Sequence, residues 1–150
     1  GNIEMICSVI KSTLVALGLA FLAQTIFSSV QSRYVYTFLS ANLINVQVAL
    51  LAINTATLGI VLTKLRDLTD RGGSSEQFHD VRRQMLLSIK EQIALVFFAI
   101  IFLSLQEAKN LPLVVPSSVF DTLLLGGFFY TIAILYDTAK SVFVLLDETP

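Results

Sequence analysis

The sequence predicts an all-α membrane protein with four transmembrane helices, of which the second and third extend into a cytoplasmic helical hairpin. The first observation is composition: 55% of the 150 residues are hydrophobic and only 14% are charged, with a mean hydropathy of +0.76. Soluble domains carry about 25% charged residues. The second observation is a set of four long uncharged runs, and the third is a biased distribution of lysine and arginine. This composition argues against a soluble enzyme and a disordered chain.

The uncharged runs locate the four spans, at residues 12–32, 34–63, 92–106 and 122–136. The first two runs can cross a hydrocarbon core of about 30 Å unaided, and the last two can do so once their flanking charges lie at the interfaces. We therefore expect one domain over residues 1–150, with spans at about 12–32, 36–62, 90–108 and 119–140. The first run is too long for the apolar region of a signal peptide and has no clear cleavage site, so we expect it to belong to the mature structure.

The second and third helices are predicted to run from about residue 34 to 71 and from about 75 to 106, with Gly72 or Gly73 ending one and Ser74 capping the next. Both exceed the thickness of a bilayer, and the excess over about 63–89 forms the predicted hairpin. The fourth helix continues past Lys140 on the same side. We expect these three segments to pack together through apolar stripes: Leu62, Leu65, Leu68, Phe78, Val81, Met85, Leu86 and Ile89.

The basic residues predict the orientation. Arg33 and Lys109 are alone in the first and third loops, whereas six of the ten basic residues lie between the second and third spans: Lys64, Arg66, Arg71, Arg82, Arg83 and Lys90. The positive-inside rule then predicts a cytoplasmic middle loop. Four spans leave both termini in the cytoplasm, and we expect the protein in the inner (plasma) membrane.

The second span carries two different faces on a helical wheel. Ser40, Gln47 and Asn54 form a polar line with a spacing of seven residues, and the other face is lined by small or short side chains: Ala41, Asn45, Ala49, Ala52, Ala56 and Gly59. The small face is typical of close helix packing in lipid. The polar line has two interpretations. It lines a pore made by several copies, or it forms hydrogen bonds inside the bundle, for example to Gln24 and Thr25 of the first span.

Few residues are candidates for a gating contact, for catalysis or for binding a ligand. Arg82, Arg83, Asp137 and Lys140 are candidates for an interface or gating contact, and Asp137 and Lys140 can also pair locally. We find no catalytic motif and no metal-ligand spacing, and the single cysteine, Cys7, excludes an internal disulfide. No span carries an ionisable residue at its middle, as proton-coupled transport would require. We therefore expect no enzyme activity, no cofactor, no metal and, at a net charge of −1, no nucleic-acid partner.

Residues 42–68 and Arg82-Arg83 carry a resemblance to a known type of protein. An amide-containing, alanine-rich second helix that runs into a charged hairpin resembles the small four-span membrane proteins of prokaryotic and phage defence, including phage-exclusion and abortive-infection proteins. That resemblance implies oligomerisation and permeabilisation of the inner membrane.

Two functions remain at this stage. The first is a homo-oligomeric channel or pore with the second span lining the path. The alternative is a non-conducting membrane anchor or scaffold that recruits a cytoplasmic protein through its helical hairpin. The expected partners are the lipid bilayer and further copies of the chain, and a cytoplasmic protein partner is compatible with either function.

Overall fold

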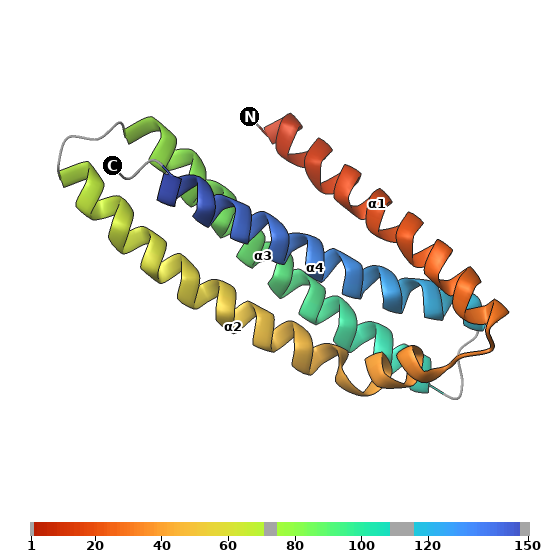
Figure 1. The fold of residues 1–150 in the computed structure, drawn as a ribbon. Helices are drawn as coiled ribbons and strands as arrows, with labels where there is room; N and C mark the ends of the chain where they lie inside the picture. The colour runs from red at the N-terminus through yellow and green to blue at the C-terminus, as the bar shows by residue number, and fades with distance from the viewer. Residues whose placement is uncertain (1, 71–74, 109–115, 148–150) are drawn as a thin grey trace.

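The computed structural model describes residues 2–70, 75–108 and 116–147, which form four long helices (Figure 1). These are α1 (Asn2–Ser29), α2 (Tyr34–Asp70), α3 (Ser75–Glu107) and α4 (Ser117–Asp147). Each contains a segment long and apolar enough to cross a membrane, as expected of an integral membrane protein. The predicted all-α fold with four such helices is confirmed. The predicted caps at Gly72, Gly73 and Ser74 lie outside the described residues.

Three of the helices pack against one another, and the remaining helix packs against one of these three. α2, α3 and α4 contact one another, whereas α1 packs along α4 (Figure 1). Gly126 of α4 permits this close approach, because a Cβ atom there would lie 3.1 Å from the Cδ2 atom of Leu17. At Gly127 a Cβ atom would meet nothing within 4 Å, so only the first glycine of the pair is needed for packing.

The turn between α1 and α2 is fixed by a Schellman motif. The backbone N–H of Ser32 donates to the carbonyl of Phe27 at 3.0 Å, and that of Gln31 donates to Ser28 at 3.2 Å. These two bonds satisfy carbonyls that the helix end would otherwise leave free. Gln31 has φ 54°, the left-handed conformation that glycine usually takes at this position.

The bundle has separate apolar clusters along its length. One lies toward the α1–α2 turn, and we call it the apolar seal: Ala20, Tyr36, Leu39, Leu43, Ala99, Phe102, Leu124 and Leu125. A second lies toward the α2–α3 connection and buries Leu58, Val61, Leu65 and Met85.

The second cluster tests the predicted apolar stripes. Leu62, Val81 and Ile89 pack against it, together with Val142 of α4. The prediction for Leu86 is wrong, because this residue lies on the outer face of α3 and is exposed. The side chains of Leu68 and Phe78 lie outside the described residues. That this part of the bundle projects beyond a bilayer stays a prediction.

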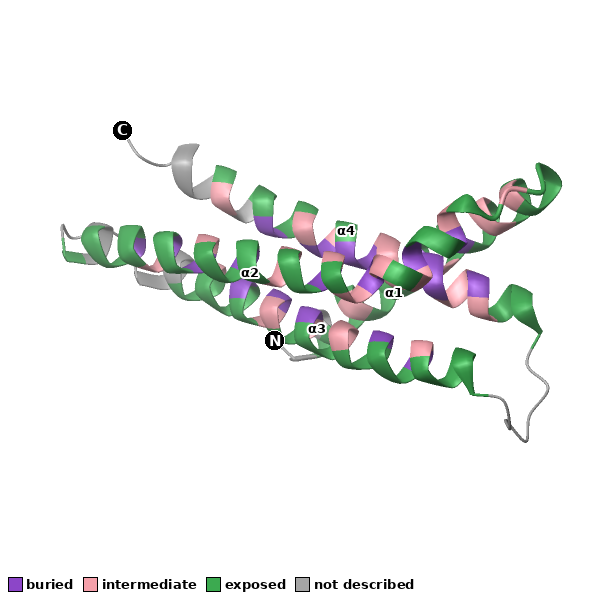
Figure 2. Cartoon of the chain, turned by 90° about the horizontal axis from the view of Figure 1, so that it is seen from below, coloured by how far each residue is buried: buried purple, intermediate pink, exposed green. Residues whose placement is uncertain are grey.

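The outward faces of the helices are exposed (Figure 2), and many of the exposed side chains are large and apolar. Phe21 of α1 and Phe97 of α3 are 62% and 64% exposed, and many other large apolar side chains share this position. So many exposed large apolar side chains are unusual for a soluble monomer and are typical of contact with lipid or with other proteins.

Candidate functional site

The middle of the bundle is polar. Gln47 and Asn54 of α2 and Gln92 of α3 are each 2% exposed, and Thr131 of α4 is 1% exposed. The Nε2 atom of Gln47 donates to the Oγ1 atom of Thr131 at 3.5 Å, a long hydrogen bond between α2 and α4. The Thr131 hydroxyl itself donates to the carbonyl of Gly127 at 2.8 Å. Buried polar side chains from three helices thus lie in the middle of the bundle, and we call these four residues the polar layer.

The amides of this layer are only partly satisfied. The Oε1 atom of Gln47, the Nδ2 atom of Asn54 and both polar side-chain atoms of Gln92 have no hydrogen-bond partner among the residues that the structure describes. The buried hydroxyls of serine and threonine differ: Ser88 donates to the carbonyl of Gln84 at 3.2 Å and Thr138 to that of Ile134 at 3.0 Å, whereas the buried hydroxyl of Tyr36 also lacks a partner in the described structure. Short hydroxyl side chains reach the carbonyl of their own helix, whereas the longer amides extend into the interior, where an unpaired polar group is costly.

The periodicity of apolar residues explains why the amides lie inside. On α2, Leu43, Gln47, Asn54, Leu58 and Leu65 follow one another at intervals of four or seven residues and so share one face. All five are buried. The leucines bring this face into the core, and the two amides are buried with them.

α3 also has a buried face on which a polar residue lies between apolar ones. Met85, Ser88, Gln92 and Ala99 are separated by three, four and seven residues, and all are buried. Gln92 is therefore one turn away from Ser88 on the inward face of the helix.

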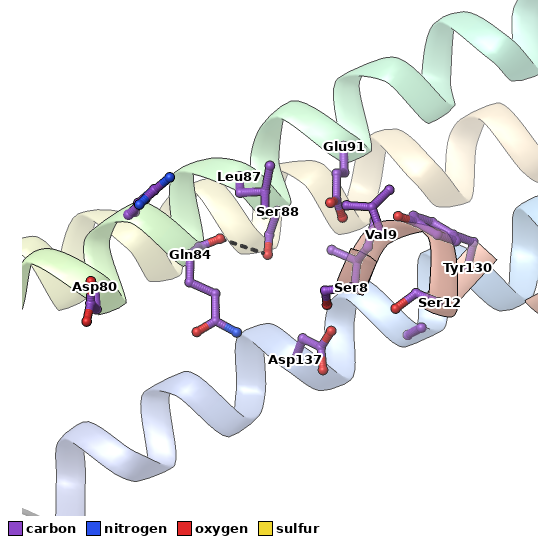
Figure 3. Close-up of a pocket in the computed structure, with 13 residues that line it drawn as sticks. Ser8, Val9, Ser12, Asp80, Gln84, Leu87, Ser88, Glu91, Tyr130 and Asp137 are labelled. Atoms are coloured by element: carbon purple, nitrogen blue, oxygen red, sulfur yellow. Dashed lines mark hydrogen bonds between the residues drawn. The ribbon is translucent and has the colours of Figure 1, made fainter. Parts of the chain in front are cut away.

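A polar cavity of about 450 Å³ lies beside this layer, between α1, α3 and α4 (Figure 3). Glu91 and Asp137 face it from α3 and α4, and the carboxylate of Glu91 interacts with the hydroxyl of Tyr130. Ser88 also lines the cavity, so Gln92 lies one helical turn deeper along the same face. The remaining lining residues are Ser8, Val9, Ser12, Asp80, Arg83, Gln84, Leu87, Ala133 and Ile134.

The apolar seal separates the polar layer from the other end of the bundle. On α2 its two leucines, Leu39 and Leu43, lie between Tyr36 and Gln47 and are about 6 Å apart along the helix at 1.5 Å per residue. At the outer edge of the seal, Tyr36 also lines a second polar pocket of about 340 Å³, together with Arg33 and Asp121. Apolar clusters therefore lie on both sides of the polar layer: the seal toward the α1–α2 turn, and the cluster of Leu58, Val61, Leu65 and Met85 toward the α2–α3 connection.

The predicted pore-lining residues lie in two different places. Gln47 and Asn54 face the interior of their own chain, in the arrangement that hydrogen bonding inside the bundle predicts. Ser40 is half-buried near the α1–α2 turn and lines a pocket there. The prediction that Gln24 and Thr25 bind these amides is wrong. Gln24 lines the pocket near Asp121, and the Thr25 hydroxyl donates to the carbonyl of Phe21.

The predicted packing face of α2 is exposed along its whole length. It comprises Ala41, Asn45, Ala49, Ala52, Ala56 and Gly59, and a Cβ atom at Gly59 would have no neighbour within 4 Å. Within one chain, then, this face contacts no other helix closely, and its role in packing stays a prediction.

The four gating candidates separate into groups. Arg83 and Asp137 line the same cavity from α3 and α4. Arg82 lies in a groove on the outer face of α3, and Lys140 is exposed on α4. A gating contact between any of them stays a prediction.

The sequence analysis missed Gln92, Thr131 and the pair of Glu91 and Tyr130. The spacing of Gln92 from Met85 and Ala99 indicates that it lies on the buried face of α3. Its position at the edge of an uncharged run indicates only where the span begins. Nothing in the sequence pairs Glu91 with Tyr130, because helical periodicity contains no information about which helices are neighbours.

Comparison with known proteins does not extend these observations. No protein-family model, no curated protein and no solved structure matches this chain. The resemblance to four-span proteins of phage exclusion and abortive infection therefore remains an expectation from the sequence alone.

Proposed function

We propose that this protein is an integral membrane channel whose conduction path runs through its own bundle, between α2, α3 and α4. The observation that carries the proposal is the buried amide layer of Gln47, Asn54 and Gln92, in which side-chain atoms have no partner within the described part of the chain. A buried amide without a hydrogen bond costs about 1–3 kcal/mol. A bundle that only had to pack would be more stable with leucine at Gln92, where both polar side-chain atoms lack a partner in the described structure.

Water meets the requirement of these amides. A polar cavity reaches within one helical turn of Gln92, and buried water typically binds to polar groups that the protein leaves unsatisfied. Amide and water dipoles replace part of the hydration shell of an ion without holding it by charge. We therefore expect a path for water and small ions with weak selectivity. By the positive-inside rule, the cavity opens toward the cytoplasm.

In this proposal the channel is closed in the structure, because buried apolar clusters lie on both sides of the polar layer. Leu39, Leu43 and Leu124 of the apolar seal are at most 2% exposed, and they lie between the polar layer and the pocket at Arg33 and Asp121. Hydrophobic constrictions of this kind gate channels by excluding water. A motion that separates α2 from α4 near these leucines would connect the polar layer with the pocket at Arg33 and Asp121.

Association of copies belongs to the same proposal. The small face of α2 is exposed in the single chain, and small side chains allow membrane helices to approach closely where lipid provides no hydrophobic driving force. The path then lies within each chain, and the small face joins the chains.

Disulfide crosslinking tests the association. In a Cys7→Ser background, Ala52→Cys should crosslink between chains, whereas Phe97→Cys, on the exposed face of α3, should not. Equal crosslinking at the two positions would contradict an interface on α2.

Planar-bilayer recording tests the conduction path. The wild-type protein should show ion currents, and Gln47→Leu and Gln92→Leu should abolish them without changing helix content. Asn42→Leu is the matched control, because the Asn42 amide donates to the carbonyl of Phe38 in its own helix at 3.0 Å and lies outside the buried layer. Unchanged current in both interior variants would overturn the path. Folded wild-type protein that passes no current at any voltage would favour the anchor or scaffold function.

A further inference from the structure

A shallow basic groove runs along the outer face of α3 near its N-terminal end, with a volume of about 380 Å³. It is lined by residues of a single helix: His79, Arg82, Arg83, Leu86, Leu87 and Lys90. Their spacing of three or four residues puts them on one face. All are exposed except Leu87, which is half-buried, so the groove is open to the surroundings of the bundle.

The same face continues as an apolar surface toward the middle of the helix. Phe97 and Ile101 follow Lys90 at seven and eleven residues and are 64% and 60% exposed. The stretch from Lys90 to Ile101 is about 16 Å long at 1.5 Å per residue. One leaflet of a bilayer has a hydrocarbon thickness of about 15 Å, half of the full core. The face therefore has a cationic part and an apolar part with the dimensions of one lipid molecule.

We infer that this basic groove binds the headgroup of an anionic phospholipid, with the acyl chain lying along Phe97 and Ile101. Arginine matches a phosphate group in a bidentate geometry, and lysine adds a point charge. The inference rests on insertion of the protein in a membrane, which is part of the proposed function, and does not depend on conduction.

The apolar residues of the groove argue for a lipid over a free phosphate or a soluble polyanion. Leu86 and Leu87 lie between the cationic side chains, where a lipid can cover them and a small hydrated anion cannot. The exposed apolar face that follows Lys90 along the helix also favours a lipid, because an acyl chain can cover it and a small hydrated anion cannot. Basic residues next to membrane spans attract anionic lipids of the cytoplasmic leaflet, the side to which the positive-inside rule assigns this end of α3.

The test uses the two cations of the groove that do not line the cavity near Tyr130. Arg83 lines both sites, so the variant of choice is Arg82→Gln with Lys90→Gln, which leaves Arg83 and the cavity unchanged. The matched control is Lys64→Gln with Arg66→Gln, two exposed cations on α2. The charge removed is the same in both variants.

Thermal unfolding in vesicles provides the readout. Vesicles of phosphatidylcholine, with and without added phosphatidylglycerol, are compared for the wild-type protein and both variants. Phosphatidylglycerol should raise the unfolding midpoint of the wild-type protein and of the control, because a ligand that binds the folded state stabilises it. In the groove variant the shift should be lost, and titration should show an affinity weakened roughly thirtyfold. Soluble glycerol phosphate should not reproduce the shift.

The outcomes separate this inference from the proposed function. Equal phosphatidylglycerol shifts in all three proteins would overturn the lipid site, as would a full shift with glycerol phosphate. Failure of the wild-type protein to float with phosphatidylcholine vesicles would instead contradict membrane insertion. A protein that inserts, binds phosphatidylglycerol through Arg82 and Lys90 and passes no current would retain the lipid site and lose the channel.

Discussion

Replacing Gln92 by leucine should make the protein more stable and less functional. Both polar atoms of this side chain are buried without a partner in the described structure, whereas the neighbouring buried hydroxyl of Ser88 is satisfied by its own helix. An unpaired buried amide costs about 1–3 kcal/mol in protein mutational data, and leucine has a similar size. Since water offsets part of this cost, Gln92→Leu should raise the free energy of unfolding by about 1–2 kcal/mol.

Equilibrium unfolding in mixed detergent micelles measures this change, with two matched amides as controls. Gln47→Leu should be close to neutral, because it removes one unpaired oxygen and also the 3.5 Å hydrogen bond to Thr131. Asn42→Leu should change stability by less than about 0.5 kcal/mol, since its amide is already bonded within α2. A loss of 1 kcal/mol or more in Gln92→Leu would mean that this amide has a stabilising partner, and the argument for a hydrated interior would fail.

Three further predictions concern the fold and the assembly. Gly126→Leu should destabilise the packing of α1 on α4 by about 1–3 kcal/mol in the same unfolding assay, whereas Gly127→Ala should not destabilise it, because only Gly126 has a neighbour within 4 Å. Gln31→Gly should stabilise the protein by about 1 kcal/mol, because it relieves a left-handed conformation at φ 54°; no gain would argue against the Schellman turn. The double variant Ala49→Leu/Ala56→Leu should dissociate the oligomer in a mass measurement and leave chain stability unchanged, and retention of the wild-type mass would exclude this face as the interface.

The extents of the central helices could be predicted from the sequence, and the start of the first could not. α2 and α3 begin and end within one residue of the predicted bounds. α1 begins at Asn2, well before the predicted span at residue 12. The absence of charge marks where lipid begins, and a helix can continue beyond that point without any change in composition.

The polar interior could be predicted only in part from the sequence. The spacing of Gln47 and Asn54 predicted one polar line, but the wheel alone left open whether it faced other copies or the bundle. The leucines at positions 43, 58 and 65 share that face and are buried. The same wheel therefore predicts that the polar line faces the bundle, provided that the large apolar residues are considered together with the polar ones. The partner Thr131 could not be predicted, since the contact depends on how α4 packs against α2.

The most direct test of the channel is to open its apolar seal and then to block its polar layer. Leu43 is 2% exposed in the seal, one helical turn from Gln47, and an amide there would extend the polar line of Gln47 toward the pocket near Arg33. Leu43→Asn should produce a constitutive ion leak in reconstituted vesicles, and adding Gln92→Leu to it should remove the leak while the folded fraction is unchanged. A leak that persists in the double variant, or a folded Leu43→Asn protein with no leak, would contradict a conduction path through the bundle.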